Sequence, residues 1–337
     1  MTTPTAQEAL LWHQLAHAKL KPAERMSVLR AAKALDGEVA DLEKWVEAGL
    51  PGVPAPVSTA FEAVLQGNVT ESFLLEELSE QGIKLLTGRD EDYPRRFKRA
   101  FLEKTPVALY AVGNTGLLGA TRTVAIVGSR DAGQDAVKLA QRAAAYFARE
   151  GYVLVSGNAR GIDQTAEEAA LQAAGKVISV LPQGLLDKAS AALIRKHSRA
   201  LLDGQHLLLS ELHPKARWQA RFAMMRNRLI MAQADAVLVA QTGAKEGVVN
   251  GKKVQSGTWA GAQEAVKLGK PVFVFDLPYE GNQLLAQELA QKISPTEDEA
   301  MFFELENLLG AHLAAQRAKP LTSGGRKRFS EQPSLFS

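Results

Sequence analysis

The 337-residue chain contains no cysteine. This absence excludes disulfides, iron–sulfur clusters and thiolate chemistry, and it fits a reducing compartment. The chain also lacks any apolar run of about 18 residues, which is the length that a membrane-spanning helix needs. Its first twenty residues carry Glu8, His13 and Lys19, so they do not match a signal peptide. We therefore expect a soluble, cytoplasmic protein that has no membrane partner.

A large excess of charge is missing too. The 40 Lys and Arg residues nearly balance 37 Asp and Glu residues, which leaves a formal net charge of +3. Many nucleic-acid-binding proteins carry a stronger excess, so the total charge decides little. The basic residues are instead clustered, and a cationic surface would have to be assembled from separate segments. These segments are residues 95–99, 195–199, 215–228 and 326–328.

Several signatures of catalysis are also absent. No G-x-x-x-x-G-K-[ST] motif of nucleoside triphosphatases occurs. The loop with Gly128 and Gly133 is not a complete G-x-G-x-x-G, and no acidic residue follows Ser156-Gly157 to hold a ribose, which disfavours a dinucleotide oxidoreductase. The six histidines show no metal-ligand spacing, and no Ser/His/Asp set stands out. We predict no cofactor, no metal site and no enzymatic activity.

The pattern of apolar residues predicts an α/β protein. Residues 1–80 are predicted to form a small all-helical module, because helical spacing is interrupted only by Pro and Gly. In residues 81–295, continuous apolar runs alternate with Ala-rich helical segments, as is typical of strands buried on both faces. This alternation predicts a doubly wound parallel sheet, an extended Rossmann-like domain. The expected strands are 124–127, 153–155, 177–181, 207–209, 236–239 and 272–275, and the expected helices are 136–150, 165–174, 189–202, 218–233 and 261–268.

The C-terminal part is predicted to be helical and then disordered. Residues 284–316 resemble two amphipathic helices, and we place the last helix at 296–318. Residues 319–337 are rich in Ser, Gly and basic residues, a composition that is typical of a disordered tail.

Three glycine-containing loops are the candidate binding elements. Ligands of open parallel sheets bind beyond the carboxyl ends of the strands, where these loops lie. Small residues let backbone N–H groups approach an anion, and the following helix N-terminus adds partial positive charge. The sequence therefore predicts a phosphate-binding rim. The loop residues are Gly128, Ser129 and Arg130, then Ser156, Gly157, Arg160 and Gly161, and then Ser256, Gly257 and Thr258.

Cationic and aromatic side chains complete the candidate site. Arg130 and Arg160 are either phosphate contacts or solvated loop arginines. Arg226 and Arg228 lie two apart on a predicted helix and point to nearly opposite faces, so both cannot line one groove. Phe222 either stacks on a base or packs in the core. The remaining candidates of this segment are Lys215, Arg217 and Asn227.

The ordered set of these segments resembles the DprA/Smf family over roughly residues 83–280. The resemblance implies a homodimer that binds single-stranded DNA and loads a RecA-type recombinase during natural transformation. The chain departs from the family pattern at Glu167, where many relatives have histidine, and residues 243–255 look like an insertion. The segments that carry the resemblance are Val124–Arg130, Ser156–Asp163, Phe222–Ile230 and Ser256–Thr258.

The tail carries a short peptide of its own. Gln332, Leu335 and Phe336 are similar to the Gln-x-x-Leu-Phe peptide with which bacterial proteins bind the β sliding clamp. A glutamine and two large apolar residues on a flexible, basic tether suit binding in a groove.

Two other interpretations remain at this point. The glycine loops also suit one small nucleotide, which would make the chain a nucleotide-binding sensor or a phosphoribohydrolase-like enzyme. The chain would alternatively be an adaptor that works through its N-terminal helices and its tail. The absence of an obvious Glu/Arg catalytic set favours single-stranded DNA binding without catalysis.

Overall fold

The computed structural model describes residues 6–34, 52–65, 68–249 and 252–318, and the chain forms two compact units. The first unit comprises the described residues up to Val112 together with Glu211–His213. The second comprises Gly113–Ser210 and the described residues from Pro214 onward. Residues 35–51 of the predicted helical module and the tail 319–337, with its predicted clamp-binding peptide, lie outside the described residues.

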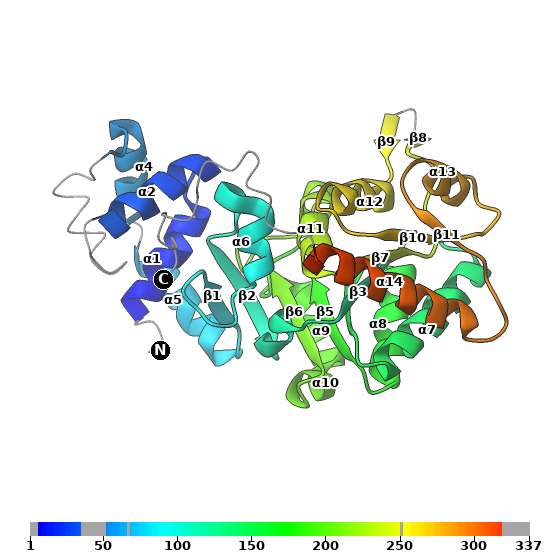
Figure 1. The fold of residues 1–337 in the computed structure, drawn as a ribbon. Coiled ribbons are helices and arrows are strands. Elements are labelled where there is room, and N and C mark those ends of the chain that lie inside the picture. The colour runs from blue at the N-terminus through cyan, green and yellow to red at the C-terminus, as the bar shows by residue number, and fades with distance from the viewer. Residues whose placement is uncertain (1–5, 35–51, 66–67, 250–251, 319–337) are drawn as a thin grey trace. The chain divides into compact units, whose positions relative to one another are not determined.

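The first unit begins with four described helices (Figure 1). The helices are α1 (Ala6–His17), α2 (Pro22–Ala34), α4 (Ala55–Leu65) and α5 (Asn68–Glu80). α1, α2 and α4 share an apolar core, and α5 packs against α1. Leu11, Trp12, Leu15, Met26 and Phe61 are almost completely buried in this core, which is consistent with the predicted helical module.

The first unit continues beyond the expected boundary at residue 80. Strands β1 (Lys84–Thr87) and β2 (Ala108–Gly113) pair antiparallel, with Leu86 opposite Leu109. Between them lie α6 (Arg95–Phe101) and the short helix η2 (Leu102–Lys104). The strand pair β1–β2 belongs to the same compact unit as these helices, so the boundary between the two units follows Val112.

The second unit contains a parallel sheet in the order β6-β5-β4-β3-β7-β10-β11. The chain winds outward from β3 in both directions, so the strand order reverses between β3 and β7, and the predicted doubly wound sheet is confirmed. The strands are β3 (Thr123–Val127), β4 (Val153–Ser156), β5 (Lys176–Val180), β6 (His206–Ser210), β7 (Ala236–Val239), β10 (Val272–Phe275) and β11 (Gln291–Ile293).

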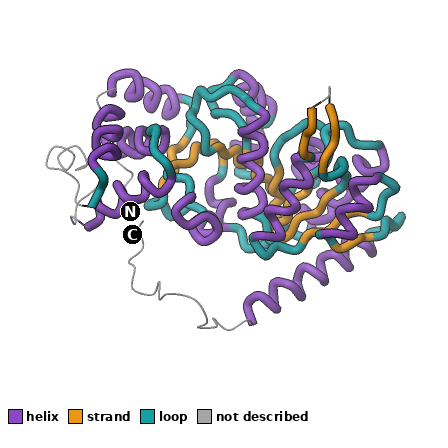
Figure 2. Tube along the Cα trace, turned by 90° about the horizontal axis from the view of Figure 1, so that it is seen from above, coloured by secondary structure: helices purple, strands orange, loops and turns teal. Residues whose placement is uncertain are grey.

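Helices flank the sheet of the second unit, and Figure 2 shows strands between helices there. One apolar core joins alternate strand residues to α7 (Gln134–Arg149), α8 (Ile162–Gln172) and α14 (Ala300–Ala318). Helix α11 (Ala220–Gln233) contacts β3, β4 and β5, and α12 (Gly257–Lys267) contacts β7 and β10. The remaining helices are η3 (Thr115–Gly119), α9 (Lys188–Lys196), α10 (Ser198–Leu202) and α13 (Glu280–Glu288).

The segment that looks like an insertion contains a hairpin. Strands β8 (Glu246–Val249) and β9 (Lys252–Gln255) pair antiparallel and stand out beside α12 and α13 (Figure 1). Among the described helices, none combines the length and the apolar character that crossing a membrane requires.

Candidate nucleic-acid interface

The first two glycine loops lie against each other. Gly161 has φ +88°, and a Cβ there would come within 2.5 Å of the Ser129 carbonyl oxygen. A Cβ at Gly128 would come within 2.6 Å of the Ile162 side chain. The backbone N–H of Ile162 donates to the same Ser129 oxygen at 3.3 Å. Only glycine permits this approach, so these positions hold the two loops together.

A buried carboxylate holds the second loop in shape. Asn158 has φ 50°, and its backbone N–H and Nδ2 donate to Glu167 at 2.8 and 2.6 Å. The Ser179 hydroxyl donates to the same carboxylate at 2.7 Å. Burial raises the pKa of Glu167 to about 7, although these donors favour its ionised form. Glu167 therefore fixes the conformation of the second loop through the backbone and side chain of Asn158. Ser156 is also buried, and its hydroxyl donates to the Ile126 carbonyl.

The third loop joins the site indirectly. Ser256 caps α12 by accepting from the Trp259 N–H, and its hydroxyl lies 3.1 Å from that of Thr242. The neighbouring Gln241 carbonyl accepts from the Ser129 N–H at 2.8 Å, which connects this region to the first loop. Asn227 Nδ2 donates to the Gly257 carbonyl at 3.0 Å, so Asn227 fixes α11 to the start of α12.

A pocket of about 610 Å³ lies where the first two loops meet the carboxyl end of β5. Of the described residues that line it, four are cationic and none is acidic. The third loop, including Thr258, does not contribute to this lining. The cationic residues are Arg130, Arg160, Lys196 and Arg226, and the polar ones include Asn158, Gln164, Gln183 and Trp218.

Arg226 supplies a buried positive charge to the pocket. The residue is only 5% exposed, and its Nε and Nη1 have no hydrogen-bond partner among the described residues. Burial lowers its pKa, while the carboxylates of Asp163 and Glu167 act in the opposite direction. Each unsatisfied buried donor costs about 1–3 kcal/mol, and more when it is charged. An anion in the adjoining pocket would offset part of this cost.

Arg130 and Trp218 form an exposed pair at the pocket. The guanidinium carbon of Arg130 lies 5.5 Å from the centre of the Trp218 ring, which is a cation–π distance. Trp218 is 47% exposed although it is a large aromatic residue. Arg160 is also exposed and pairs with Asp131 at 2.5 Å. A solvent-exposed pair of this kind contributes little, so Arg160 can exchange Asp131 for a phosphate at small cost.

Other sequence-predicted residues lie outside the pocket lining. Arg228 is half-buried, in contrast to Arg226, as expected for positions two apart on α11. Phe222 is half-buried beneath the Arg221 guanidinium, at 4.8 Å. Lys215 and Arg217 are exposed and precede α11.

Several lining residues were not among the site residues predicted from the sequence, and three of them, Trp218, Gln183 and Lys196, carry polar or charged groups that suit a ligand. Trp218 was passed over, although a tryptophan within a basic, polar segment was a usable signal. Gln183 is buried in the lining with an Oε1 that has no partner among the described residues, and Lys196 comes from α9. No motif marks these last two. Gln183 follows β5 and Lys196 ends α9, and only folding brings both beside the glycine loops.

Asp163 has a structural contact at the base of the loops. It is 6% exposed, and its Oδ1 accepts from the Gly128 N–H at 3.3 Å. Burial raises its pKa, and the nearby Arg226 opposes that rise. The carboxylate thus joins the two loops beneath the pocket and is not part of its described lining.

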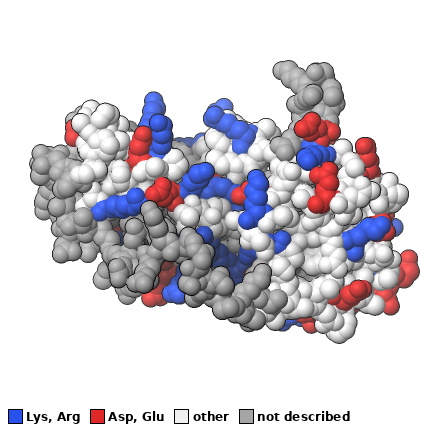
Figure 3. All heavy atoms as spheres, turned by 45° about the horizontal axis from the view of Figure 1, so that its top comes forward, with Lys and Arg blue, Asp and Glu red and all other residues white. Residues whose placement is uncertain are grey.

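The wider surface has mixed charge. Figure 3 shows Lys and Arg side chains on the drawn face interspersed with Asp and Glu, in keeping with the small net charge. An anionic ligand would therefore be selected by the local composition of the pocket and not by a uniformly basic surface.

Comparison with known proteins decides the family. Residues 84–304 match the family model described as DNA recombination-mediator protein A. The chain belongs to the DNA recombination-mediator protein A family. A DNA processing protein DprA of Bacillus subtilis is 31% identical over 234 residues, covering 67% of this chain and 73% of the relative. A DNA processing protein DprA of Streptococcus pneumoniae is 31% identical over 223 residues, covering 64% and 72%.

Solved structures of the DprA family have the same fold. The X-ray structure of DNA processing protein A from Streptococcus pneumoniae superposes with a TM-score of 0.63 at 26% identity, covering 89% of this chain and 98% of that one. DNA processing protein A from Helicobacter pylori, described in its single-stranded DNA binding mode, gives a TM-score of 0.52 at 28% identity, covering 69% and 96%. The resemblance of the sequence to the DprA/Smf family and the predicted Rossmann-like fold are thereby confirmed.

Proposed function

We propose that this member of the family binds single-stranded DNA in the pocket of the second unit. The proposal rests on the composition of the pocket lining: among its described residues, four side chains are cationic and none is a carboxylate. Phosphates of a flexible strand fit such a site, because Arg, Lys and backbone N–H groups make most phosphate contacts. The single-stranded DNA binding mode described for the Helicobacter pylori relative supports this choice of ligand.

The rim of the pocket suits an unpaired base. Trp218 is exposed beside Arg130, and an aromatic ring next to a cation is a common platform for single-stranded nucleic acids. Bases stack on such rings with little regard to sequence. We therefore propose that Trp218 stacks on a base, a role that the sequence had suggested for Phe222. Binding would be weakly dependent on sequence and strongly dependent on salt.

The pocket is proposed to bind DNA without catalysing a reaction. A phosphoribohydrolase-like enzyme would need a carboxylate that reaches its substrate, as hydrolysis of glycosidic bonds generally uses one. Asp163 and Glu167, at the base of the loops, are buried and engaged with loop backbone or side-chain groups. The exposed Asp131 and Glu168 are each paired with a cation of the lining, Arg160 and Lys196 respectively. These contacts support a binding role over the enzyme alternative.

Further roles are proposed from the family resemblance. We infer that the chain forms a homodimer, protects single-stranded DNA and assists loading of a RecA-type recombinase in transformation or recombination. Its relatives named DNA processing protein support a place in DNA processing. The peptide with Gln332, Leu335 and Phe336 is proposed to contact the β sliding clamp.

Thermal-shift measurements separate the DNA-binding proposal from its nucleotide-binding rival. The full chain would be heated with oligo-dT or with mononucleotides, at equal phosphate concentration. A strand that contacts several cationic groups should raise the melting temperature more than single nucleotides do. Stabilisation by one mononucleotide, with none by oligo-dT, would instead favour the sensor or enzyme.

A further inference from the structure

Three histidines from two distant parts of the sequence come together in the first unit. His13 and His17 lie one turn apart on α1, and His213 belongs to the segment Glu211–His213 of the same unit. The ring centre of His213 lies 5.3 Å from that of His13 and 5.0 Å from that of His17. The spacing of the histidines along the chain does not indicate this cluster, because His213 comes from a segment about 200 residues after α1.

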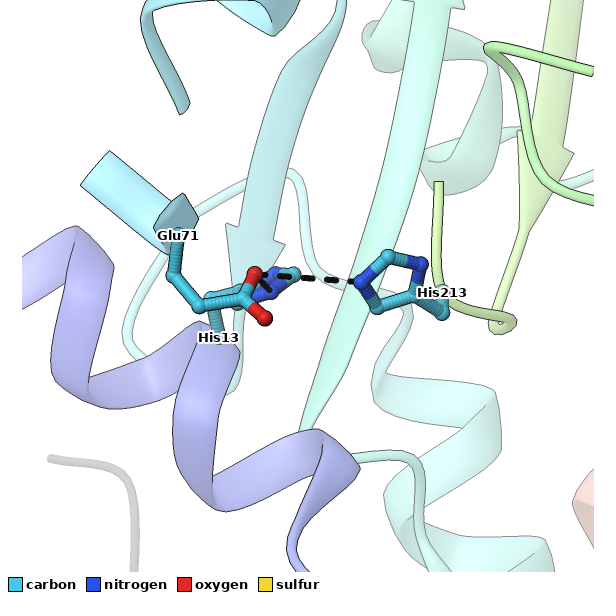
Figure 4. A group of neighbouring side chains, drawn as sticks. All are labelled: His13, Glu71 and His213. Carbon is cyan, nitrogen blue, oxygen red and sulfur yellow. Dashed lines mark hydrogen bonds and ion pairs between the residues drawn. The ribbon is translucent and has the colours of Figure 1, made fainter. Parts of the chain in front are cut away.

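A carboxylate from a third element lies between two of these rings. Glu71 of α5 places Oε2 2.7 Å from His13 Nε2 and 3.8 Å from His213 Nε2 (Figure 4). One ligand atom from each of the three residues lies within 4.8 Å of the others. In a tetrahedral zinc site with bonds of about 2.0–2.1 Å, ligand atoms are about 3.3 Å apart. The His13–Glu71 and Glu71–His213 distances lie on either side of that value, and the third pair lies within 4.8 Å, so side-chain movements would bring the three ligands to one ion.

We propose that His13, Glu71 and His213 bind a zinc ion, with water as the fourth ligand. Two imidazoles and one carboxylate are typical zinc ligands, whereas calcium and magnesium prefer sites built mainly of oxygen. The side chain of His13 is 1% exposed, but those of His213 and Glu71 are 35% and 32% exposed. These two side chains leave a route for the ion and room for its water.

The surrounding hydrogen bonds suit this role. Tyr110 Oη lies 2.6 Å from His13 Nδ1 and 2.9 Å from His17 Nε2. With zinc on His13 Nε2, the Nδ1–H of His13 donates to Tyr110, and the Tyr110 hydroxyl donates to His17. Metal-bound histidines usually have their second ring nitrogen held in this way.

The same atoms form a complete network without the metal. The His13 Nε2–H then donates to Glu71, Tyr110 donates to His13 Nδ1, and the His17 Nε2–H donates to Tyr110. Between the two states His13 and His17 each change tautomer, and the Tyr110 hydroxyl changes the ring to which it donates. The number of protons on these three side chains stays the same. Zinc binding would therefore need only a tautomer exchange and a small movement of His213 and Glu71.

Zinc at this site would link α1, α5 and the segment 211–213. Because the three ligands come from distant parts of the sequence, binding would add to the free energy of folding of the first unit. The inference does not depend on DNA binding by the second unit.

Cobalt and zinc binding to the untagged full chain test the proposal. After treatment with EDTA and removal of the chelator, the protein would be titrated with cobalt chloride and followed by visible absorption. We expect one cobalt per chain, with the intense bands of a tetrahedral site, and displacement of cobalt by zinc sulfate. Zinc should also raise the melting temperature, whereas magnesium chloride should not.

His213→Ala is the decisive variant, because His213 is partly exposed and its loss should not unfold the chain. We expect it to weaken cobalt and zinc binding at least tenfold and to remove the zinc-dependent rise in melting temperature. Glu71→Gln should act in the same direction, and His312→Ala, a change in α14, should bind as the wild type does. Absence of tetrahedral cobalt bands in the wild type would overturn the proposal, as would equal affinity of wild type and His213→Ala.

Discussion

The guanidinium of Arg226 packs directly against the backbone of Gly157. A Cβ at Gly157 would lie 1.2 Å from Arg226 Nη1, so the absence of a side chain there is what admits the arginine. Gly157 belongs to the second glycine loop, and Arg226 comes from the middle of α11. The glycine therefore positions a buried cation beside the pocket, in addition to shaping a loop.

Gly157→Ala should displace this cation and weaken binding. The added methyl group forces the guanidinium away from its place beside the pocket. We expect affinity for oligo-dT to fall about 5–30-fold, which corresponds to about 1–2 kcal/mol. Fluorescence anisotropy measures the effect. Gly119→Ala is the control, because no atom lies within 4 Å of a Cβ at that position, and it should leave affinity unchanged. Equal affinity of both variants would remove Arg226 from the binding mechanism.

Arg130→Ala should weaken binding to every single strand by a similar factor. A phosphate contact carries no sequence information, and its loss reduces the salt slope of log K by about 0.7–1 unit. Titrations of oligo-dT and a mixed-sequence strand at several salt concentrations measure both effects. Arg149→Ala removes an exposed arginine that pairs with Glu299 on another part of the unit, and it should bind normally. A selective loss for one sequence would argue that Arg130 contacts a base instead.

Trp218→Ala should reduce affinity for single strands by about 1–3 kcal/mol, the usual value of one base–aromatic stack. Trp218→Phe should retain most of the binding, because a smaller ring still stacks. Phe222→Ala serves for comparison, since this half-buried ring contacts Arg221 and does not line the pocket. A larger loss from Phe222→Ala than from Trp218→Ala would restore the stacking role to Phe222.

The buried Glu167 should make stability depend on pH. Its pKa is raised from 4.5 to about 7 in the folded chain, so between these values the folded state holds a proton that the unfolded state has lost. This contribution to stability is complete below the unfolded pKa, and it is lost as pH rises through the folded pKa. The melting temperature of the wild type should therefore fall relative to that of Glu167→Gln between about pH 5 and 8.

The comparison with Glu167→Gln is necessary because another buried group acts with the opposite sign. Burial lowers the pKa of His206 from 6.5 to about 3. The contribution of His206 to stability therefore rises as pH rises from about 3 to 6.5, opposite to that of Glu167. Both proteins share His206, and the difference between their melting curves isolates Glu167. Parallel curves over the whole pH interval would show that Glu167 does not titrate in this interval.

The sheet of the second unit was predictable because its strands have a simple pattern. The run Val124–Val127 and the five later runs are continuous apolar segments between helical ones, and each forms a strand. Strands β1, β2 and β11 were not predicted. β1 and β11 are short. β1 pairs antiparallel with β2, and that region shows no alternation of apolar runs with helical segments that would predict a sheet. The hairpin of β8 and β9 was foreseen only as an insertion.

The site was predictable at the level of loops and less so at the level of side chains. All three glycine loops were expected to share one rim, because parallel strands place their carboxyl ends on one edge. The first two contribute to the pocket lining, and the third does not. The sequence left open which of Arg226 and Arg228 faces the ligand, and burial against Gly157 assigns Arg226 to the pocket lining. The contribution of α9 depends on how the helix after β5 packs, which no local pattern encodes.

Titration of oligo-dT and a duplex of equal length, each at two salt concentrations, tests the central claim most directly. A pocket with four cationic side chains and an exposed tryptophan should bind the single strand more tightly than the duplex, because duplex bases cannot reach Trp218. Its affinity should fall steeply as salt rises. Equal affinity for both DNAs, or affinity that is independent of salt, would contradict the account.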